Sequence, residues 1–109
     1  MNNRLEIAHE FADAINSDKI IKIIVFGSVA RGDDHDDSDI DILILSNQRE
    51  NIEQVVDDEI ARIMYDKQEL ISAHIMDEEF FNQTKNFSFL SSVLKEGVVI
   101  GWWDLFFHW

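Results

Sequence analysis

Two aspartates separated by one isoleucine are well placed in this chain to bind a metal ion. The triplet Asp39-Ile40-Asp41 stands at the start of an apolar run over residues 42–45, which predicts a buried strand. Side chains alternate along a strand, so both carboxylates should point to one face, with their Cα atoms roughly 6.5–7 Å apart. Neighbouring carboxylates repel each other, and a divalent cation such as Mg²⁺ removes that penalty. We therefore expect Asp39 and Asp41 to be metal ligands.

Ten residues separate a glycine–serine pair from the first of these aspartates. Gly27 and Ser28 follow an apolar run over residues 20–26, which predicts a second buried strand. Glycine lets a ligand approach the backbone closely, and amides at a turn that leads into a helix, together with a serine hydroxyl, bind anions. Arg31 could pair with a phosphate. Phosphate at one end of the motif and metal at the other suit phosphoryl or nucleotidyl transfer.

The acidic stretch between these features has two other interpretations. Six aspartates within residues 33–41 could form only a solvated turn, or they could bind calcium. The calcium reading is weaker, because the stretch lacks the central glycine and terminal glutamate of an EF-hand loop. We expect His35 to be an exposed loop residue. Four aspartates should solvate the loop rather than bind metal: Asp33, Asp34, Asp36 and Asp37.

The spacing Gly-Ser, ten residues, Asp-x-Asp resembles the signature of the polymerase-β-like nucleotidyltransferases. The string GSVARGDDHDDSDIDILI is similar to their smallest branch, the minimal nucleotidyltransferases (MNT), and the resemblance runs from about Asn3 to Gly101. It implies an α/β (α+β) fold, in which helices pack on a small mixed β-sheet. We expect an MNT domain over residues 1–101, followed by an aromatic tail over 102–109.

The resemblance also implies a reaction, cofactors and a partner. Asp39 and Asp41 would hold two Mg²⁺ ions, and the ATP phosphates would bind at Gly27, Ser28 and Arg31. MNT proteins paired with HEPN-domain toxins act as antitoxins that transfer AMP to a tyrosine hydroxyl of the toxin, a ribonuclease. We therefore expect a cytoplasmic, magnesium-dependent protein adenylyltransferase with a HEPN partner.

Active members of this superfamily usually add a third carboxylate from a later strand. Glu69, at the start of the predicted third strand, is the candidate. It could instead be a solvated residue between a helix and a strand. Asp77 is a weaker candidate, because an N-cap role already explains it. Without a third carboxylate the chain could bind nucleotide yet transfer slowly or not at all.

Two other functions stay open. The chain could be a non-catalytic, nucleotide-binding antitoxin that occludes its partner. It could also modify a small molecule, as antibiotic-modifying nucleotidyltransferases do, but these generally carry an added helical domain for which 109 residues leave no room.

The amino-acid composition limits the kinds of partner and site that we expect. Nine basic and 22 acidic residues give a net charge of −13, which argues against a nucleic-acid backbone as partner. The chain has no cysteine, which excludes disulfides and zinc–thiolate sites and is compatible with the cytoplasm. We expect a single domain, with no signal peptide and no apolar run long enough to span a membrane.

Helices and strands should alternate around the motif. Periodic apolar residues predict helices over 3–16, 51–67 and 87–96, and alternation predicts a third strand over 69–76. Residues 29–31 should form a short helix or turn, Asp77 should cap a short helix, and residues 98–100 should form an edge strand. Two sets of side chains should face the core: Ile52, Val55, Val56, Ile60, Ile63 and Met64 in the long helix, and Phe87, Leu90, Val93 and Leu94 in the last one.

The last nine residues, GWWDLFFHW, contain all three tryptophans of the chain. The family pattern normally stops just before them. The tail could pack back over a groove, bind a partner or pair in a homo-oligomer, or be an artefact of cloning or reading frame.

Overall fold

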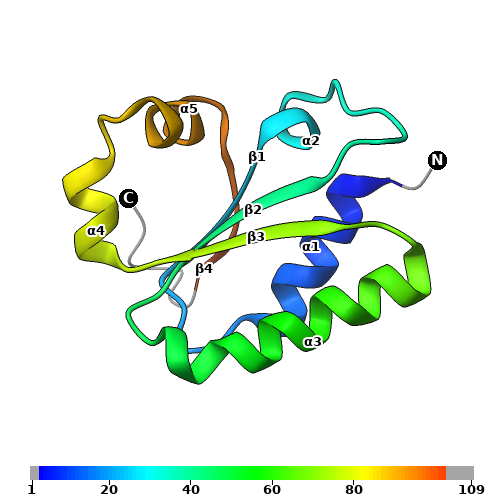
Figure 1. The fold of residues 1–109 in the computed structure, drawn as a ribbon, viewed down its shortest axis with the longest axis horizontal. Helices are drawn as coiled ribbons and strands as arrows, with labels where there is room; N and C mark the ends of the chain where they lie inside the picture. Colours follow the sequence, from blue (N-terminus) through cyan, green and yellow to red (C-terminus); the bar gives the residue numbers. More distant parts are fainter. Residues whose placement is uncertain (1–2, 103–109) are drawn as a thin grey trace.

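The computed structural model describes residues 3–102, which form five helices and four strands (Figure 1). Their order is α1 (Arg4–Ile15), β1 (Lys22–Phe26), α2 (Gly27–Arg31), β2 (Ile40–Leu45), α3 (Arg49–Lys67), β3 (Ile71–Met76), α4 (Glu78–Thr84), α5 (Ser88–Glu96) and β4 (Val98–Trp102). Within residues 3–102 no helix is both long enough and apolar enough to cross a membrane.

The strands form one mixed sheet in the order β3-β2-β1-β4. β1 lies antiparallel to both β2 and β4, whereas β2 and β3 run parallel. Phe26, the last residue of β1, pairs with Asp41 near the start of β2. This register places the end of one strand of the motif beside the beginning of the other, and it confirms the predicted mixed α+β sheet.

Helices cover both faces of the sheet (Figure 1). On one face Ile40, Ile42 and Ile44 of β2 pack in a cluster with buried residues of α1 and α3. On the other face Leu43 and Leu45 pack with buried residues of α4 and α5. Alternation along β2 therefore directs Asp41 to the face covered by α4 and α5.

Helix ends follow the local sequence. Asn3 caps α1 by accepting a hydrogen bond from the Glu6 amide at 3.2 Å. Asp77 caps α4 in the same way, with the Phe80 amide at 2.7 Å, so the predicted N-cap role of Asp77 is confirmed. Gly32, at φ +78°, ends α2 in the left-handed conformation that glycine adopts readily.

Element boundaries and some core assignments differ from expectation. The long helix starts two residues earlier than predicted, at Arg49, and β3 starts two residues later, at Ile71. Four residues predicted to face the core are exposed: Val55, Met64, Phe87 and Leu94. Phe87 is the extended N-cap residue of α5 and lies outside the helix whose inner face it was predicted to share. From residue 103 onward, the predicted aromatic tail lies outside the described residues.

Candidate functional site

The bend at Gly27 and Ser28 lies beside Asp41 at one end of the antiparallel pair of strands β1 and β2. Gly27 has φ +70°, a conformation that side-chain-bearing residues rarely adopt. A Cβ atom placed on Gly27 would lie 2.4 Å from Oδ2 of Asp41 and 3.3 Å from its Cγ. The carboxylate of Asp41 therefore lies directly against the backbone of the bend, and only glycine leaves it room.

Ser28 lies in the first turn of α2, immediately after this bend. Phe26 occupies the N-cap position of α2 and supplies no side-chain hydrogen bond to the first amides. A hydroxyl and amides at the start of a helix can donate to an anion. The phosphate-binding features predicted at Gly27 and Ser28 thus lie beside the carboxylate predicted to bind metal.

Burial and neighbouring charges perturb the pKa of the Asp41 carboxyl. Partial burial, and then the charge of Asp39, raise the pKa of the Asp41 carboxyl, while His74 and Arg31 lower it by a smaller amount. Asp39 itself is exposed to solvent. A carboxylate whose ionisation is disfavoured by a second carboxylate nearby is a group that a bound cation stabilises.

Arg31 lies near the site but already has two acidic partners. Its guanidinium forms ion pairs with Asp33 at 3.2 Å and with Glu96 of α5 at 3.1 Å. The side chain is 43% exposed, so it could exchange these partners for a phosphate group. The predicted phosphate contact of Arg31 requires that exchange.

The neighbouring strand β3 brings no carboxylate to this face. Ser72 pairs with Asp41 and His74 pairs with Leu43, so both side chains share the face of Asp41. The His74 ring lies 6.2 Å from the ring of Phe26. No group of three or more His, Cys, Asp or Glu side chains able to hold a metal occurs among residues 3–102.

Glu69, the predicted third carboxylate, lies next to Arg4 of α1. Its Oε2 is 2.5 Å from Nε of Arg4, and the two side chains are only 10% and 2% exposed. Because α1 covers the other face of the sheet, this contact draws the carboxylate away from the face of Asp41. A role for Glu69 at the metal stays a prediction.

The residues at this end of β1 and β2 suit the binding of a magnesium ion. Mg²⁺ is commonly held by one or two carboxylates and takes its remaining ligands from water and substrate phosphates. Asp39 and Asp41 supply such a pair, and the Gly27 bend leaves space beside them that a Cβ would fill.

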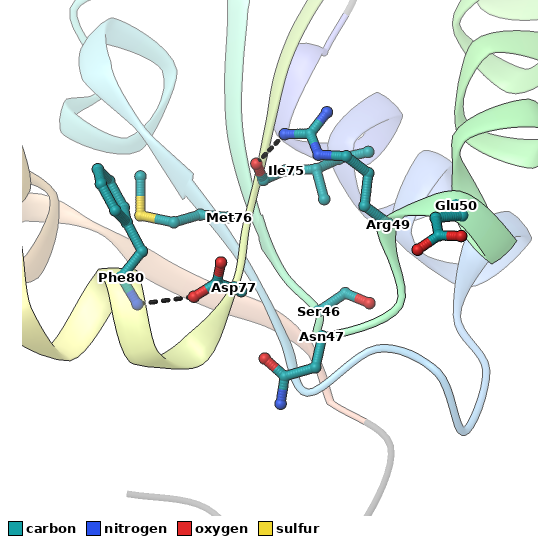
Figure 2. Close-up of a pocket in the computed structure, with 8 residues that line it drawn as sticks. All are labelled: Ser46, Asn47, Arg49, Glu50, Ile75, Met76, Asp77 and Phe80. Carbon is teal, nitrogen blue, oxygen red and sulfur yellow. Dashed lines mark hydrogen bonds between the residues drawn. The ribbon is translucent and has the colours of Figure 1, made fainter.

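A separate pocket of about 420 Å³ lies at the opposite end of β2 and β3 (Figure 2). It is lined by Ser46, Asn47, Arg49, Glu50, Ile75, Met76, Asp77 and Phe80. Ser46 lies five residues beyond Asp41, roughly 16 Å along an extended strand. Polar groups of this pocket bind one another: Asp77 caps α4, and Arg49 donates to the Ile75 carbonyl. The pocket is therefore distinct from the Gly27–Asp41 site.

Comparison with known proteins identifies the family. The model of the nucleotidyltransferase domain matches residues 8–100. A Methanocaldococcus jannaschii protein named "Putative protein adenylyltransferase MJ0604" is 39% identical over 101 residues, which cover 90% of this chain and 98% of the relative.

Solved structures share the fold. A protein described as "a putative nucleotidyltransferase" from Sulfolobus solfataricus superposes with a TM-score of 0.53 at 22% identity, over 93% of this chain and 86% of the other. A structure described as "the toxin-antitoxin with AMP-PNP" gives a TM-score of 0.54 at 18% identity, over 96% of this chain and 76% of the other.

Proposed function

This chain belongs to the nucleotidyltransferase domain family, and we propose that it is a magnesium-dependent antitoxin that transfers AMP from ATP to a protein. The acceptor is a tyrosine hydroxyl on a HEPN-domain ribonuclease toxin, and the pair works in the cytoplasm. One observation carries the proposal: the Asp41 carboxylate lies against the Gly27 bend, where a phosphate and a metal can be held together.

Each residue of the site has a role in this reaction. Asp39 and Asp41 would hold the two Mg²⁺ ions, and bound magnesium would neutralise phosphate charge and favour ionisation of the attacking hydroxyl. Ser28 and the first amides of α2 donate to the phosphate oxygens, and Gly27 lets them approach. Arg31 releases an acidic partner and pairs with a phosphate.

The chemical step is a single in-line displacement. The phenolic oxygen of the acceptor bonds to the α-phosphorus of ATP, the bond from that phosphorus to the β-phosphate oxygen breaks, and pyrophosphate leaves. The hydroxyl proton passes to water. The protein forms no covalent intermediate, and its contribution is to position the reactants and to stabilise charge.

A protein acceptor has two sources of support. The relative that shares 39% identity over nearly its whole length carries protein adenylyltransferase in its name. The net charge of −13 repels a nucleic-acid backbone but is compatible with a protein partner that has a basic surface.

Transfer of label tests the proposal. The purified chain, its co-encoded partner and ATP labelled at the α-phosphate should give labelled partner only when Mg²⁺ is present. Asp39→Asn and Asp41→Asn should each reduce labelling at least ~100-fold, since a metal supplies several kcal/mol of charge stabilisation and each ~1.4 kcal/mol is tenfold in rate. Labelling that persists in both variants would contradict the metal assignment.

Arg62→Met is a matched control for these variants. Arg62 pairs with Glu10, Glu59 and Asp66 on the surface of α1 and α3, and those helices cover the other face of the sheet. Its loss should leave labelling unchanged, so a drop in this variant would indicate a general effect of replacing a charged surface residue.

A non-catalytic antitoxin is the second candidate, and the absence of a carboxylate at Ser72 and His74 favours it. In that case the chain would bind magnesium and ATP and form a tight complex with its partner, and the partner would stay unlabelled. Calorimetry of ATP binding, combined with the labelling assay, separates the two functions.

A further inference from the structure

Arg4 is a buried cation near the start of α1, outside the site described above. Its side chain is 2% exposed, although arginine is almost never fully buried unless it is paired. Burial alone would lower the pKa of its guanidinium, but the carboxylates of Asp34 and Glu69 more than offset that effect, and the pKa is raised. Arg4 therefore stays charged in the interior.

Its partners come from two distant segments. Nη1 donates to Oδ2 of Asp34 at 2.9 Å, and Nη2 donates to the backbone carbonyl of Asp36 at 3.0 Å. Both partners belong to the loop over residues 33–39, which ends at Asp39. On its other side Arg4 contacts Glu69, two residues before β3 begins.

The loop has its own internal contacts, but these are short in range. The His35 amide donates to Ser38 Oγ at 2.9 Å, and the Ser38 amide donates to the His35 carbonyl, also at 2.9 Å. Such contacts shape the turn without fixing it relative to the sheet. Arg4 links the loop to a helix that is itself packed in the core.

Repulsion among the aspartates of the loop gives a physical reason for this contact with Arg4. The loop and the first residues of β2 carry six aspartates within nine residues, and like charges at this spacing repel one another. A buried guanidinium that binds one carboxylate and one carbonyl of the loop opposes that repulsion. The two loop contacts of Arg4 lie at Asp34 and Asp36, five and three residues before Asp39.

We propose that Arg4 is a positioning residue, which anchors the 33–39 loop so that Asp39 lies beside Asp41, and which thereby sets the affinity for magnesium and ATP. Glu69 orients Arg4 from the opposite side. This inference rests on the proposed function for its ligand, but the anchoring of the loop can be measured independently.

The test compares Arg4→Met and Asp34→Asn with the control Arg62→Met. Amide hydrogen exchange should accelerate at residues 33–39 in the first two variants and stay unchanged in the control. In calorimetry with ATP and MgCl₂, Arg4→Met and Asp34→Asn should bind about tenfold more weakly than wild type, because partners that orient metal ligands typically affect affinity by that factor or more. Arg4→Lys should recover only part of this loss, since one ammonium cannot reproduce the planar fork.

Asp34→Asn keeps the Arg4–Glu69 pair and therefore decides the matter if Arg4→Met fails to fold. Wild-type exchange rates and wild-type affinity in Asp34→Asn would overturn the inference. If wild type binds no ATP with magnesium, the proposed function fails, and the exchange experiment still decides whether Arg4 anchors the loop.

Discussion

At the scale of single residues, two glycines with positive φ have different surroundings. A Cβ on Gly27 would collide with the Asp41 carboxylate, whereas a Cβ on Gly32 would meet nothing within 4 Å. Both positions carry the same backbone strain when substituted, but only Gly27 touches the site. Comparing substitutions at these two glycines therefore separates the effect of backbone strain from the effect of displacing Asp41.

We predict that Gly27→Ala and Gly32→Ala each lower the free energy of unfolding by about 1–2 kcal/mol, the usual cost of the left-handed conformation. Gly27→Ala should also displace Asp41 and reduce magnesium-dependent ATP binding at least ~10-fold, a typical cost when a metal ligand loses its orientation. Urea denaturation and calorimetry measure the two effects. Equal loss of binding in both variants would show that backbone strain alone is responsible.

The raised pKa of Asp41 predicts a cost in stability without metal. A group whose pKa is higher in the folded than in the unfolded protein stabilises the fold at low pH, and this contribution is lost as the pH rises through the folded pKa. At neutral pH and without Mg²⁺, Asp41→Asn should therefore melt at a higher temperature than wild type. The advantage should shrink as the pH falls through the raised pKa.

Thermal melts at several pH values in the presence of EDTA check this prediction. Asp13→Asn, which alters an exposed residue of α1, controls for the change in net charge. An advantage of Asp41→Asn that does not depend on pH would exclude the titration of Asp41 as its cause.

At the scale of elements, the junction between α3 and β3 places Glu69 beside Arg4 of α1. Ile71 packs in the core shared with α1 and α3, and Glu69 contacts Arg4 of α1. The side chains that β3 presents toward Asp41 are instead Ser72 and His74. The start of β3 is thus joined to the N-terminal helix by an ion pair.

We predict that Glu69→Gln lowers the free energy of unfolding by about 2 kcal/mol, somewhat less than the ~3–5 kcal/mol lost when a buried pair is broken, because Arg4 keeps its loop partners. Glu10→Gln, which weakens the exposed pair with Arg62, should cost less than ~1 kcal/mol. Urea denaturation measures both. A Glu69→Gln variant as stable as wild type would show that the ion pair between Arg4 and Glu69 does not contribute to stability.

At the scale of the whole molecule, the charge of −13 is spread over 109 residues and opposes compactness. Raising NaCl from about 0.01 M to about 0.1 M shortens the screening length from about 30 Å to about 10 Å. The melting temperature in EDTA should rise by a few degrees, because relief of repulsion outweighs the loss of weak surface ion pairs. A lower melting temperature at the higher salt concentration would show that ion pairs dominate.

Much of the fold could be predicted because its signals are local. The apolar runs that became β1 and β2, the periodic helices α1 and α3, and the Asp77 cap depend on residues close together in the chain. Val55 and Phe87 were predicted to face the core but are exposed. Periodicity identifies an apolar stripe but not how much of it is covered, and Phe87 precedes α5 as its N-cap.

Residue types at fixed short spacings were enough to identify the family and the order of most elements, and to predict the roles of Gly27, Ser28, Asp39 and Asp41. Which carboxylates share a face of the sheet could be learned only from the folded arrangement of the strands. Glu69 is 28 residues from Asp41 in the chain, and the pairing of β3 with β2 and the buried charge of Arg4 determine where it points. Such contacts depend on packing between distant segments, which no local pattern of residues records.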